Sequence, residues 1–189
     1  MHILALDPGE STGYVKADVS TIANPSAEDI VRCTIQFLTY GTWKGLKEFH
    51  ELVEPLFSST AVCIVEDYLI YPNRVKAHIG SGVYTLREIG RIEYAAFIHG
   101  LTRENGHLVF YVASTAKPAW KDDRLKVYLR VDNYKYQFKH VIDAVRHLYT
   151  YLERSGMLFG DNPNIIGGGG QRHRRKHYDG GKSNPRPHE

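Results

Sequence analysis

A change in hydrophobic period near Trp43 limits what this chain can fold into more than any other feature of its sequence. Before Trp43, the apolar segments are short, and they alternate with polar residues or stop at turn residues, as the first one does at Asp7-Pro-Gly. After it, apolar residues recur every three or four positions, at Leu46, Phe49, Leu52, Val53, Leu56 and Phe57. The pattern therefore predicts three strands, at 2–6, 12–17 and 32–40, and then an amphipathic helix.

The rest of the body alternates between strand and helix patterns. Ala61–Val65 is a continuous apolar run of strand length that ends at Glu66. Helices are predicted at 83–99 and 136–153, a strand at 108–112, and a short helical or irregular segment at 115–130. The apolar positions of the first helix are Val83, Leu86, Ile89, Phe97 and Ile98, and the expected inward positions of the second are Phe138, Val141, Ala144, Val145, Leu148 and Leu152. The order β-β-β-α-β-α-β-α favours an α/β fold with a mixed five-stranded β-sheet flanked by helices.

Composition separates a nearly neutral body from a basic tail. The 189 residues include 24 Lys and Arg against 21 Asp and Glu, and residues 171–189 hold six of these basic residues but only two of the acidic ones. After Gly156 the periodic patterns end, and four consecutive glycines at 167–170 follow. We therefore predict one domain over 1–155 and a flexible Gly-rich and basic extension over 156–189.

The two cysteines and the N-terminal residues indicate in which cellular compartment the protein is expected to lie. Cys33 and Cys63 each lie in an apolar run without a neighbouring metal ligand, which predicts reduced core thiols. The N-terminal residues lack the positive flank of a signal peptide, and no apolar stretch approaches the roughly 20 residues that a membrane-spanning helix needs. The expectation is a cytoplasmic protein without a membrane function.

Three acidic residues occupy positions where an ordinary core would be apolar. Asp7 and Glu66 each follow a predicted strand, and Asp143 interrupts the apolar face of the last helix. His140 and His147 lie three residues before and four residues after Asp143, so they share its helix face. A buried carboxylate is costly unless it is neutralised, and a converging set of carboxylates suits Mg²⁺ or Mn²⁺.

Three short motifs resemble the RuvC family of Holliday-junction resolvases, within the ribonuclease H-like superfamily. They are Ile-Leu-Ala-Leu-Asp7-Pro-Gly-Glu-Ser-Thr-Gly-Tyr, Val-Cys-Ile-Val-Glu66 and His140-Val-Ile-Asp143-Ala-Val-Arg-His. The resemblance covers about residues 1–153 in element order, and it implies a ribonuclease H-like nuclease domain. The implied activity is that of a Mg²⁺-dependent crossover junction endodeoxyribonuclease. The spacing departs from the bacterial enzyme at 18–31, at 118–136 and in the tail, as in a divergent, for example phage-encoded, member.

The same resemblance implies a two-metal site and a dimer. Asp7 would bridge two Mg²⁺ ions, with Glu66, His140 and Asp143 as the other ligands, and Mn²⁺ as a substitute. Two such ions lie roughly 3.5–4 Å apart and support in-line hydrolysis at phosphorus, which in this family leaves a 5′-phosphate and a 3′-hydroxyl. A homodimer is implied because two nicks in opposed strands need two active sites related by a two-fold axis.

Contacts with branched DNA follow from two further segments. Ser114-Thr-Ala-Lys117 resembles the family segment whose lysine approaches the scissile phosphate, and the loop after Glu66 matches a region that carries a base-stacking aromatic residue. The predicted DNA-binding residues are Lys117, Lys121, Arg124, Lys126, Tyr68, Tyr71, Arg74 and Lys76.

Simpler interpretations stay open for these residues. Asp7 is also favoured at the start of a turn, and Glu66 at a solvated strand end. His147 either supports the site or packs in the core, and it is left out of the predicted catalytic set. Lys117 is also compatible with an ordinary surface charge, and one of the loop tyrosines is expected to cover the core edge. The basic tail is either a non-specific DNA arm or a solvated segment.

Other functions fit the sequence less well. Actin-like and sugar-kinase ATPases open with a similar turn but need a second glycine-rich phosphate loop, and Gly167–Gly170 has no strand after it, so no nucleotide cofactor is expected. A ribonuclease H-like nuclease of another specificity, YqgF-type or branch-trimming, would use the same metal chemistry. A catalytically silent junction-binding protein has no reason to keep self-repelling carboxylates. A zinc site made by His140, Asp143 and His147 would leave both strand carboxylates unused.

Overall fold

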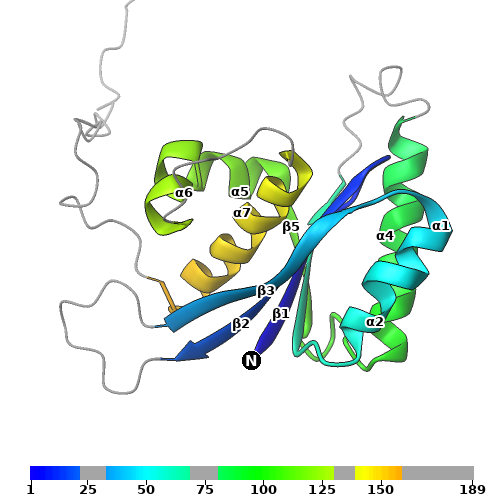
Figure 1. Cartoon of the computed structure of the whole chain (residues 1–189), viewed down its shortest axis with the longest axis horizontal. Helices are drawn as coiled ribbons and strands as arrows, with labels where there is room; N and C mark the ends of the chain where they lie inside the picture. Colours follow the sequence, from blue (N-terminus) through cyan, green and yellow to red (C-terminus); the bar gives the residue numbers. More distant parts are fainter. Residues whose placement is uncertain (22–32, 69–80, 130–138, 159–189) are drawn as a thin grey trace, which may run out of the picture.

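A mixed β-sheet between two layers of helices forms the centre of the molecule (Figure 1). The structure is a computed structural model. The structure describes residues 1–21, 33–68, 81–129 and 139–158. Its strands are β1 (His2–Asp7), β2 (Thr12–Thr21), β3 (Cys33–Trp43), β4 (Val62–Asp67) and β5 (Leu108–Val112). The predicted α/β class and five-stranded mixed sheet are confirmed, and the second and third strands are longer than the sequence pattern indicated.

The strand order places the ends of three strands at one edge of the sheet. The order is β3-β2-β1-β4-β5, with β1 antiparallel to β2, and with β4 parallel to both β1 and β5. Parallel neighbours have their carboxyl ends on the same side. Asp7 at the end of β1 and Glu66 near the end of β4 therefore lie at the same edge as the chain that leaves β5.

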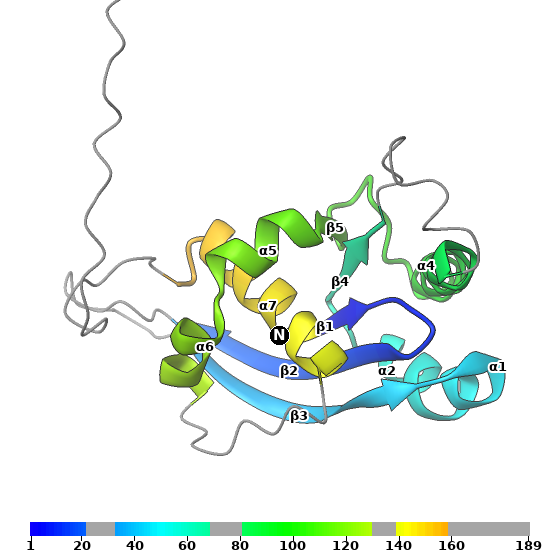
Figure 2. The same ribbon diagram turned by 90° about the horizontal axis from the view of Figure 1, so that it is seen from above.

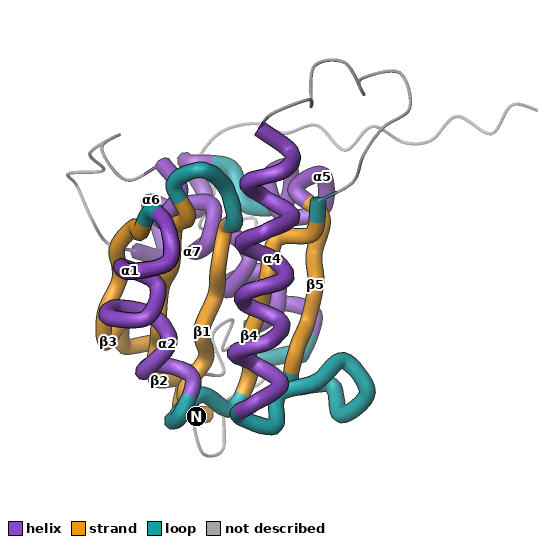
Figure 3. Tube along the Cα trace, turned by 90° about the vertical axis from the view of Figure 1, so that its right-hand side faces the viewer, coloured by secondary structure: helices purple, strands orange, loops and turns teal. Residues whose placement is uncertain are grey.

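Two helical layers cover the two faces of the sheet (Figures 2 and 3). One layer contains α5 (Ala113–Ala119), α6 (Asp122–Leu129) and α7 (Lys139–Arg154). The other contains α1 (Gly45–Glu48), the π-helical turn η1 (Phe49–Val53), α2 (Glu54–Phe57) and α4 (Ser81–Ile98). A separate apolar cluster fills the space under each layer.

The two-residue period of β1 assigns its side chains to these two clusters. Ile3 and Ala5 belong to the α7 cluster, whereas Leu4 and Leu6 belong to the α4 cluster. Because successive side chains of a strand point to opposite faces, Asp7 continues the series of Ile3 and Ala5. Its carboxylate is therefore directed to the face that α7 covers.

The predicted helix after Trp43 is interrupted. Phe49, Val53 and Phe57 are buried, but Leu46 and Leu52, which the regular period turned inward, are exposed. Pro55 lacks the N–H that a regular helix would use at that position, and the π-helical turn directly precedes α2. The wider π-helical turn rotates the apolar face of this segment relative to a regular α-helix. The buried residues Phe49, Val53 and Phe57 are therefore four positions apart.

The apolar residues that indicated α4 do not all face the sheet. Ile89 is buried as expected, whereas Leu86, Phe97 and Ile98 are exposed. The other buried positions, at Ile92, Ala95 and Ala96, include two small residues that allow the helix to lie close to the sheet. A criterion that favours large apolar side chains misses such a face.

The end of the domain and the cysteines complete the fold. Leu158 is buried in the α7 cluster, so packing continues past the predicted boundary at residue 155, and 159–189 lie outside the described residues. Cys33 and Cys63 are buried free thiols, as predicted. Within the described ranges, none of the helices combines the length and the apolar character that crossing a bilayer requires.

Candidate active site

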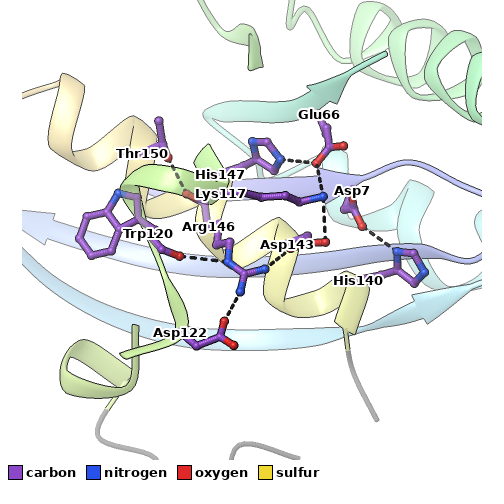
Figure 4. A network of polar contacts seen from close by, with 10 residues as sticks. All are labelled: Asp7, Glu66, Lys117, Trp120, Asp122, His140, Asp143, Arg146, His147 and Thr150. Carbon is purple, nitrogen blue, oxygen red and sulfur yellow. Dashed lines mark hydrogen bonds and ion pairs between the residues drawn. The ribbon is translucent and has the colours of Figure 1, made fainter. Parts of the chain in front are cut away.

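Three carboxylates from three separate elements meet where β1 and β4 end. Leu6 pairs with Val65, so Asp7 and Glu66, the next residue of each strand, follow a shared register. Ile64 belongs to the α7 cluster, and the strand period directs Glu66 to the same face as Asp7. Asp143 enters from α7 and is 2% exposed. The predicted convergence of Asp7, Glu66 and Asp143 is present, as Figure 4 shows.

Gly13 lets α7 approach the sheet closely enough to form this cluster. It pairs with Asp7 across the β1–β2 ladder. A Cβ atom built on Gly13 would lie 2.1 Å from the His140 carbonyl carbon and 2.5 Å from the Val141 nitrogen. The first turn of α7 therefore rests directly on the β2 backbone, at a position that only glycine can occupy without moving the helix.

Each carboxylate has a partner on α7 (Figure 4). The His140 Nδ1 atom lies 2.7 Å from Asp7 Oδ2, and the His147 Nε2 atom lies 2.7 Å from Glu66 Oε2. Arg146 donates to Asp143 Oδ1 in a close contact. One helix thus supplies a nitrogen donor to each of the three acids.

Arg146 also connects this helix to α5 and α6. Its Nε donates to the Trp120 carbonyl oxygen at 3.0 Å, and its second terminal nitrogen pairs with Asp122. Trp120 is fully buried, and its ring nitrogen donates to Glu153 at 3.1 Å. These bonds fix the Arg146 guanidinium, which leaves Asp143 Oδ2 as the oxygen that faces the other carboxylates.

Lys117 lies between two of the carboxylates. Its Nζ is 3.2 Å from Asp143 Oδ2 and 3.8 Å from Glu66 Oε2, and its side chain is 44% exposed. Burial opposes the charge on this ammonium, but the charges of Glu66 and Asp143 outweigh burial and raise the pKa of Lys117 above its usual value. The cluster therefore holds a cation at its open side.

Burial and repulsion between the carboxylates raise the pKa of Asp7. Burial is the main cause that raises the pKa of Asp7 from 3.8 to about 6, with the charges of Glu66 and Asp143 adding to it and the hydrogen bond with His140 opposing it. The same hydrogen bond raises the pKa of His140. Burial pushes the pKa of Glu66 upward, but the hydrogen bond with His147 and the charge of Lys117 lower it overall. Adjacent carboxylates with different proton affinities are typical of functional sites.

A groove extends from the carboxylates along α5 and α6. One cavity of about 250 Å³ is lined by Asp7, Glu66, Tyr68 and His140, among others, and a second of about 680 Å³ is lined by Lys121, Asp122, Asp123 and Arg146. Lys117, Lys139 and Asp143 line both cavities. The groove therefore combines the acidic cluster with three lysines.

The structure brings together some of the predicted DNA-binding residues and not others. Lys117 and Lys121 line the groove, and Tyr68 lines the smaller cavity while packing against the α4 cluster. Arg124 is engaged within the fold, because it donates to Glu153 at 2.9 Å and lies 3.8 Å from the Trp120 ring centroid. The Lys126 side chain, Tyr71, Arg74 and Lys76 lie outside the described residues.

Four residues of the site were absent from the sequence-based site prediction: His147, Arg146, Lys139 and Gly13. The acidic and histidine side chains whose ligand atoms lie within 4.8 Å of one another are Asp7, Glu66 and His147. His147 was noticed on the Asp143 face but left out of the catalytic set, and the four-residue spacing was the available signal. Gly13 lies in the predicted strand 12–17 and in the first of the three motifs, and a glycine within a strand was the available signal for a close backbone approach.

Comparisons with known proteins give one structural likeness. No protein-family model matches this sequence, and no curated protein matches it either. Among solved structures, the chain is similar to the Fowlpox virus resolvase in its crystal structure with substrate Holliday junction DNA, with a TM-score of 0.41 and 13% sequence identity. The likeness covers 82% of this chain and 99% of that chain.

Proposed function

We propose that this protein is a divalent-metal-dependent, structure-selective DNA endonuclease that cuts four-way or related branched DNA. The observation that carries the proposal is the convergence of Asp7, Glu66 and Asp143, from two strands and a helix, on one cavity, where Lys117 pairs with Glu66 and Asp143. Carboxylates that repel one another are retained where they bind a cation. The ribonuclease H-like resemblance of the sequence motifs directs this chemistry to phosphodiester hydrolysis.

The residues present fit a Mg²⁺ or Mn²⁺ site. Ligand oxygens of Asp7 and Glu66 lie within 4.8 Å of each other, close to the separation that two Mg²⁺–oxygen bonds of about 2.0–2.1 Å span, so a small side-chain shift lets one ion contact both. Asp143 Oδ2 faces the same space. We assign the metal to these three carboxylates. His140 lies at the solvent-exposed end of this site. A bound divalent cation would activate water for attack at phosphorus and stabilise the departing 3′ oxygen, which leaves a 5′-phosphate.

The protein residues around the carboxylates have separate tasks in this reaction. The contacts from α7 hold each acid in one orientation, which removes the need to reorganise them during the reaction. Lys117, Lys121 and Lys139 line the groove, and we assign them to contacts with the phosphates of the bound DNA. Phosphate contacts of this kind place the DNA without reading its sequence.

Cleavage of synthetic DNA tests this function. We expect paired, symmetric nicks near the crossover of a four-way junction with Mg²⁺ or Mn²⁺ and none with EDTA, while matched linear duplex stays intact. Cleavage spread over flaps or single strands would instead support a ribonuclease H-like nuclease of another specificity. The absence of cleavage with any divalent metal would contradict the proposal.

Replacement of Lys117 should separate DNA cleavage from metal binding. In Lys117→Met the cation that competes for Glu66 and Asp143 is lost, so Mn²⁺ should bind more tightly. The phosphate contact is lost as well, so cleavage at saturating metal should fall about a hundredfold. Calorimetric Mn²⁺ titration and single-turnover cleavage measure the two effects. The control is Lys47→Met, which removes an exposed lysine on α1, and weaker Mn²⁺ binding by Lys117→Met would contradict this role.

We also propose that two copies associate through the outer face of α4. Among the described residues, large exposed apolar side chains gather on this face, at Leu86 (48% exposed), Tyr94 (67%), Phe97 (68%) and Ile98 (55%). Gly90 lies between them, and a Cβ built on it would meet nothing within 4 Å. An antiparallel pair of α4 helices crossing at Gly90 would place Arg87 opposite Glu93 of the partner subunit, three residues on either side of the crossing. Glu93 also pairs with Arg103 of its own subunit at 2.6 Å, so Arg87 of the partner subunit would extend an existing ion pair.

A single charge on this face should separate the dimer. We expect Phe97→Glu to sediment as a monomer at concentrations where the wild type is a dimer, because a carboxylate would be buried without a partner. Its nicks in a four-way junction should become uncoupled, while Mn²⁺ binding stays unchanged. Leu46→Glu, on the exposed side of α1, is the control. A dimeric Phe97→Glu protein would exclude the α4 face.

A further inference from the structure

We propose that His147 is a positioning residue for Glu66: its buried ring donates the Nε2 proton to one carboxylate oxygen and leaves the other oxygen for the metal. This inference rests on the proposed metal site. It concerns a residue outside the predicted set of metal ligands. Its basis is the hydrogen-bonding state of one buried side chain.

The His147 ring is enclosed and has a single polar partner. It is 0% exposed, on the inner face of α7 beside Ala144 and Leu148 of the core. Its Nε2 lies 2.7 Å from Glu66 Oε2. Among the described residues, its Nδ1 is the one buried side-chain nitrogen or oxygen that has no hydrogen-bond partner.

These two facts select one form of the ring. The tautomer with its proton on Nδ1 would bury an N–H without an acceptor, which is more costly than a buried lone pair. The Nδ1–H form would also point the Nε2 lone pair at a carboxylate oxygen. The tautomer with the proton on Nε2 avoids both problems, so His147 is a hydrogen-bond donor to Glu66.

The same reasoning separates His147 from a metal ligand. A histidine that binds metal through Nε2 carries its proton on Nδ1 and almost always donates it to a carboxylate, carbonyl or water. His147 offers no such acceptor at Nδ1. Its place within 4.8 Å of Asp7 and Glu66 ligand atoms therefore reflects its bond to Glu66.

Holding Glu66 matters because its contact with Lys117 is lost when the site is used. Glu66 Oε2 faces both His147 and Lys117, and the proposed reaction turns Lys117 toward phosphate. Without Lys117, the donor from His147 is what keeps the carboxylate in one orientation, with Oε1 directed to the cation. Partners of metal-binding carboxylates typically contribute about 10–100-fold to metal affinity or activity.

Metal affinity of two variants tests the role. His147→Leu keeps an apolar side chain of similar size but loses the donor, and Mn²⁺ affinity by calorimetry should fall about tenfold or more. His147→Gln places an amide N–H as many bonds from Cα as Nε2 is in histidine, and it should recover most of the affinity. Thr150→Val, which removes a hydrogen bond on the same helix away from the carboxylates, should bind Mn²⁺ as the wild type does.

The proton itself is visible by ¹⁵N-resolved NMR of the histidine rings. The His147 Nε2 resonance should carry a directly bonded proton, with Nδ1 unprotonated, both without metal and with Mg²⁺ bound. Loss of the Nε2 proton on adding Mg²⁺ would make His147 a ligand and overturn the inference. Equal Mn²⁺ affinity of His147→Leu and the wild type would also overturn it, whereas a wild type that binds no Mn²⁺ would overturn the metal site as a whole.

Discussion

Asp7→Asn is expected to abolish metal-dependent cleavage while leaving junction binding largely intact. Asp7 is the buried acid at the centre of the cluster, where its carboxylate meets His140 and the charges of Glu66 and Asp143. Metal assistance is worth several kcal/mol in such reactions, and each 1.36 kcal/mol is tenfold in rate. The cleavage rate at saturating Mg²⁺ should therefore fall by about a thousandfold or more.

Three measurements make this prediction specific to the metal site. Junction affinity in EDTA should change little, because lysines rather than Asp7 bind phosphate. The raised pKa of Asp7 means that its charged form is unfavourable in the folded, metal-free protein above about pH 6, so the asparagine variant should be at least as stable there as the wild type. Asp18→Asn, an acid of β2 bonded to the N-terminus, is the control. Normal cleavage by Asp7→Asn would remove the proposed site.

The convergence of the acids could be predicted from the sequence because it depends on period and element order alone. A two-residue period places Asp7 and Glu66 on one face of their strands, and the β-then-α order places a helix over that face. The three- and four-residue spacings of His140 and His147 from Asp143 give a shared helix face. None of these arguments needs the conformation of a side chain.

Which acid each α7 residue contacts could not be predicted in this way. His140 and His147 lie on the same helix face, yet one bonds Asp7 and the other Glu66, which is decided by how α7 is placed along the sheet. The role of Arg146 depends on Asp122 and the Trp120 carbonyl, 24 and 26 residues away in sequence. Such partners depend on how separate elements pack together. The spacing of residues along one element carries no information about that packing.

The two helical segments whose apolar residues do not all face the sheet show the same limit of a sequence pattern. Exposed Leu86 and Phe97 on α4 are larger and more apolar than buried Ala95 and Ala96, so a pattern based on hydrophobicity assigns them to the core. If α4 contacts a second copy, those residues are buried in the dimer. The sequence pattern would then describe two apolar surfaces of one helix, only one of which faces the subunit's own sheet.

Gly13→Ala should reduce both the stability of the protein and its cleavage activity, because it moves α7, which carries Asp143 and His140. The new Cβ would lie 2.1–2.5 Å from backbone atoms of His140 and Val141, and backbone atoms cannot rotate away as a side chain can. Overpacking typically costs about 1–3 kcal/mol, and a clash with fixed backbone belongs at the upper end. For a chain of this length we expect the melting temperature to fall by about 10 °C.

The effect on cleavage should exceed what the loss of stability explains. A displacement of α7 by about 1 Å separates Asp143 and His140 from Asp7 and Glu66, and misplacement on that scale can reduce a rate about a hundredfold. Cleavage measured well below the melting temperature, with Mn²⁺ affinity from calorimetry, distinguishes a moved site from an unfolded fraction. Gly9→Ala is the matched control, because its Cβ would meet its nearest neighbour, the Ser11 carbonyl oxygen, at an ordinary 3.5 Å. If Gly13→Ala kept the wild-type Mn²⁺ affinity, α7 would have to shift without moving the carboxylate it carries, and the close approach at Gly13 would then serve packing alone.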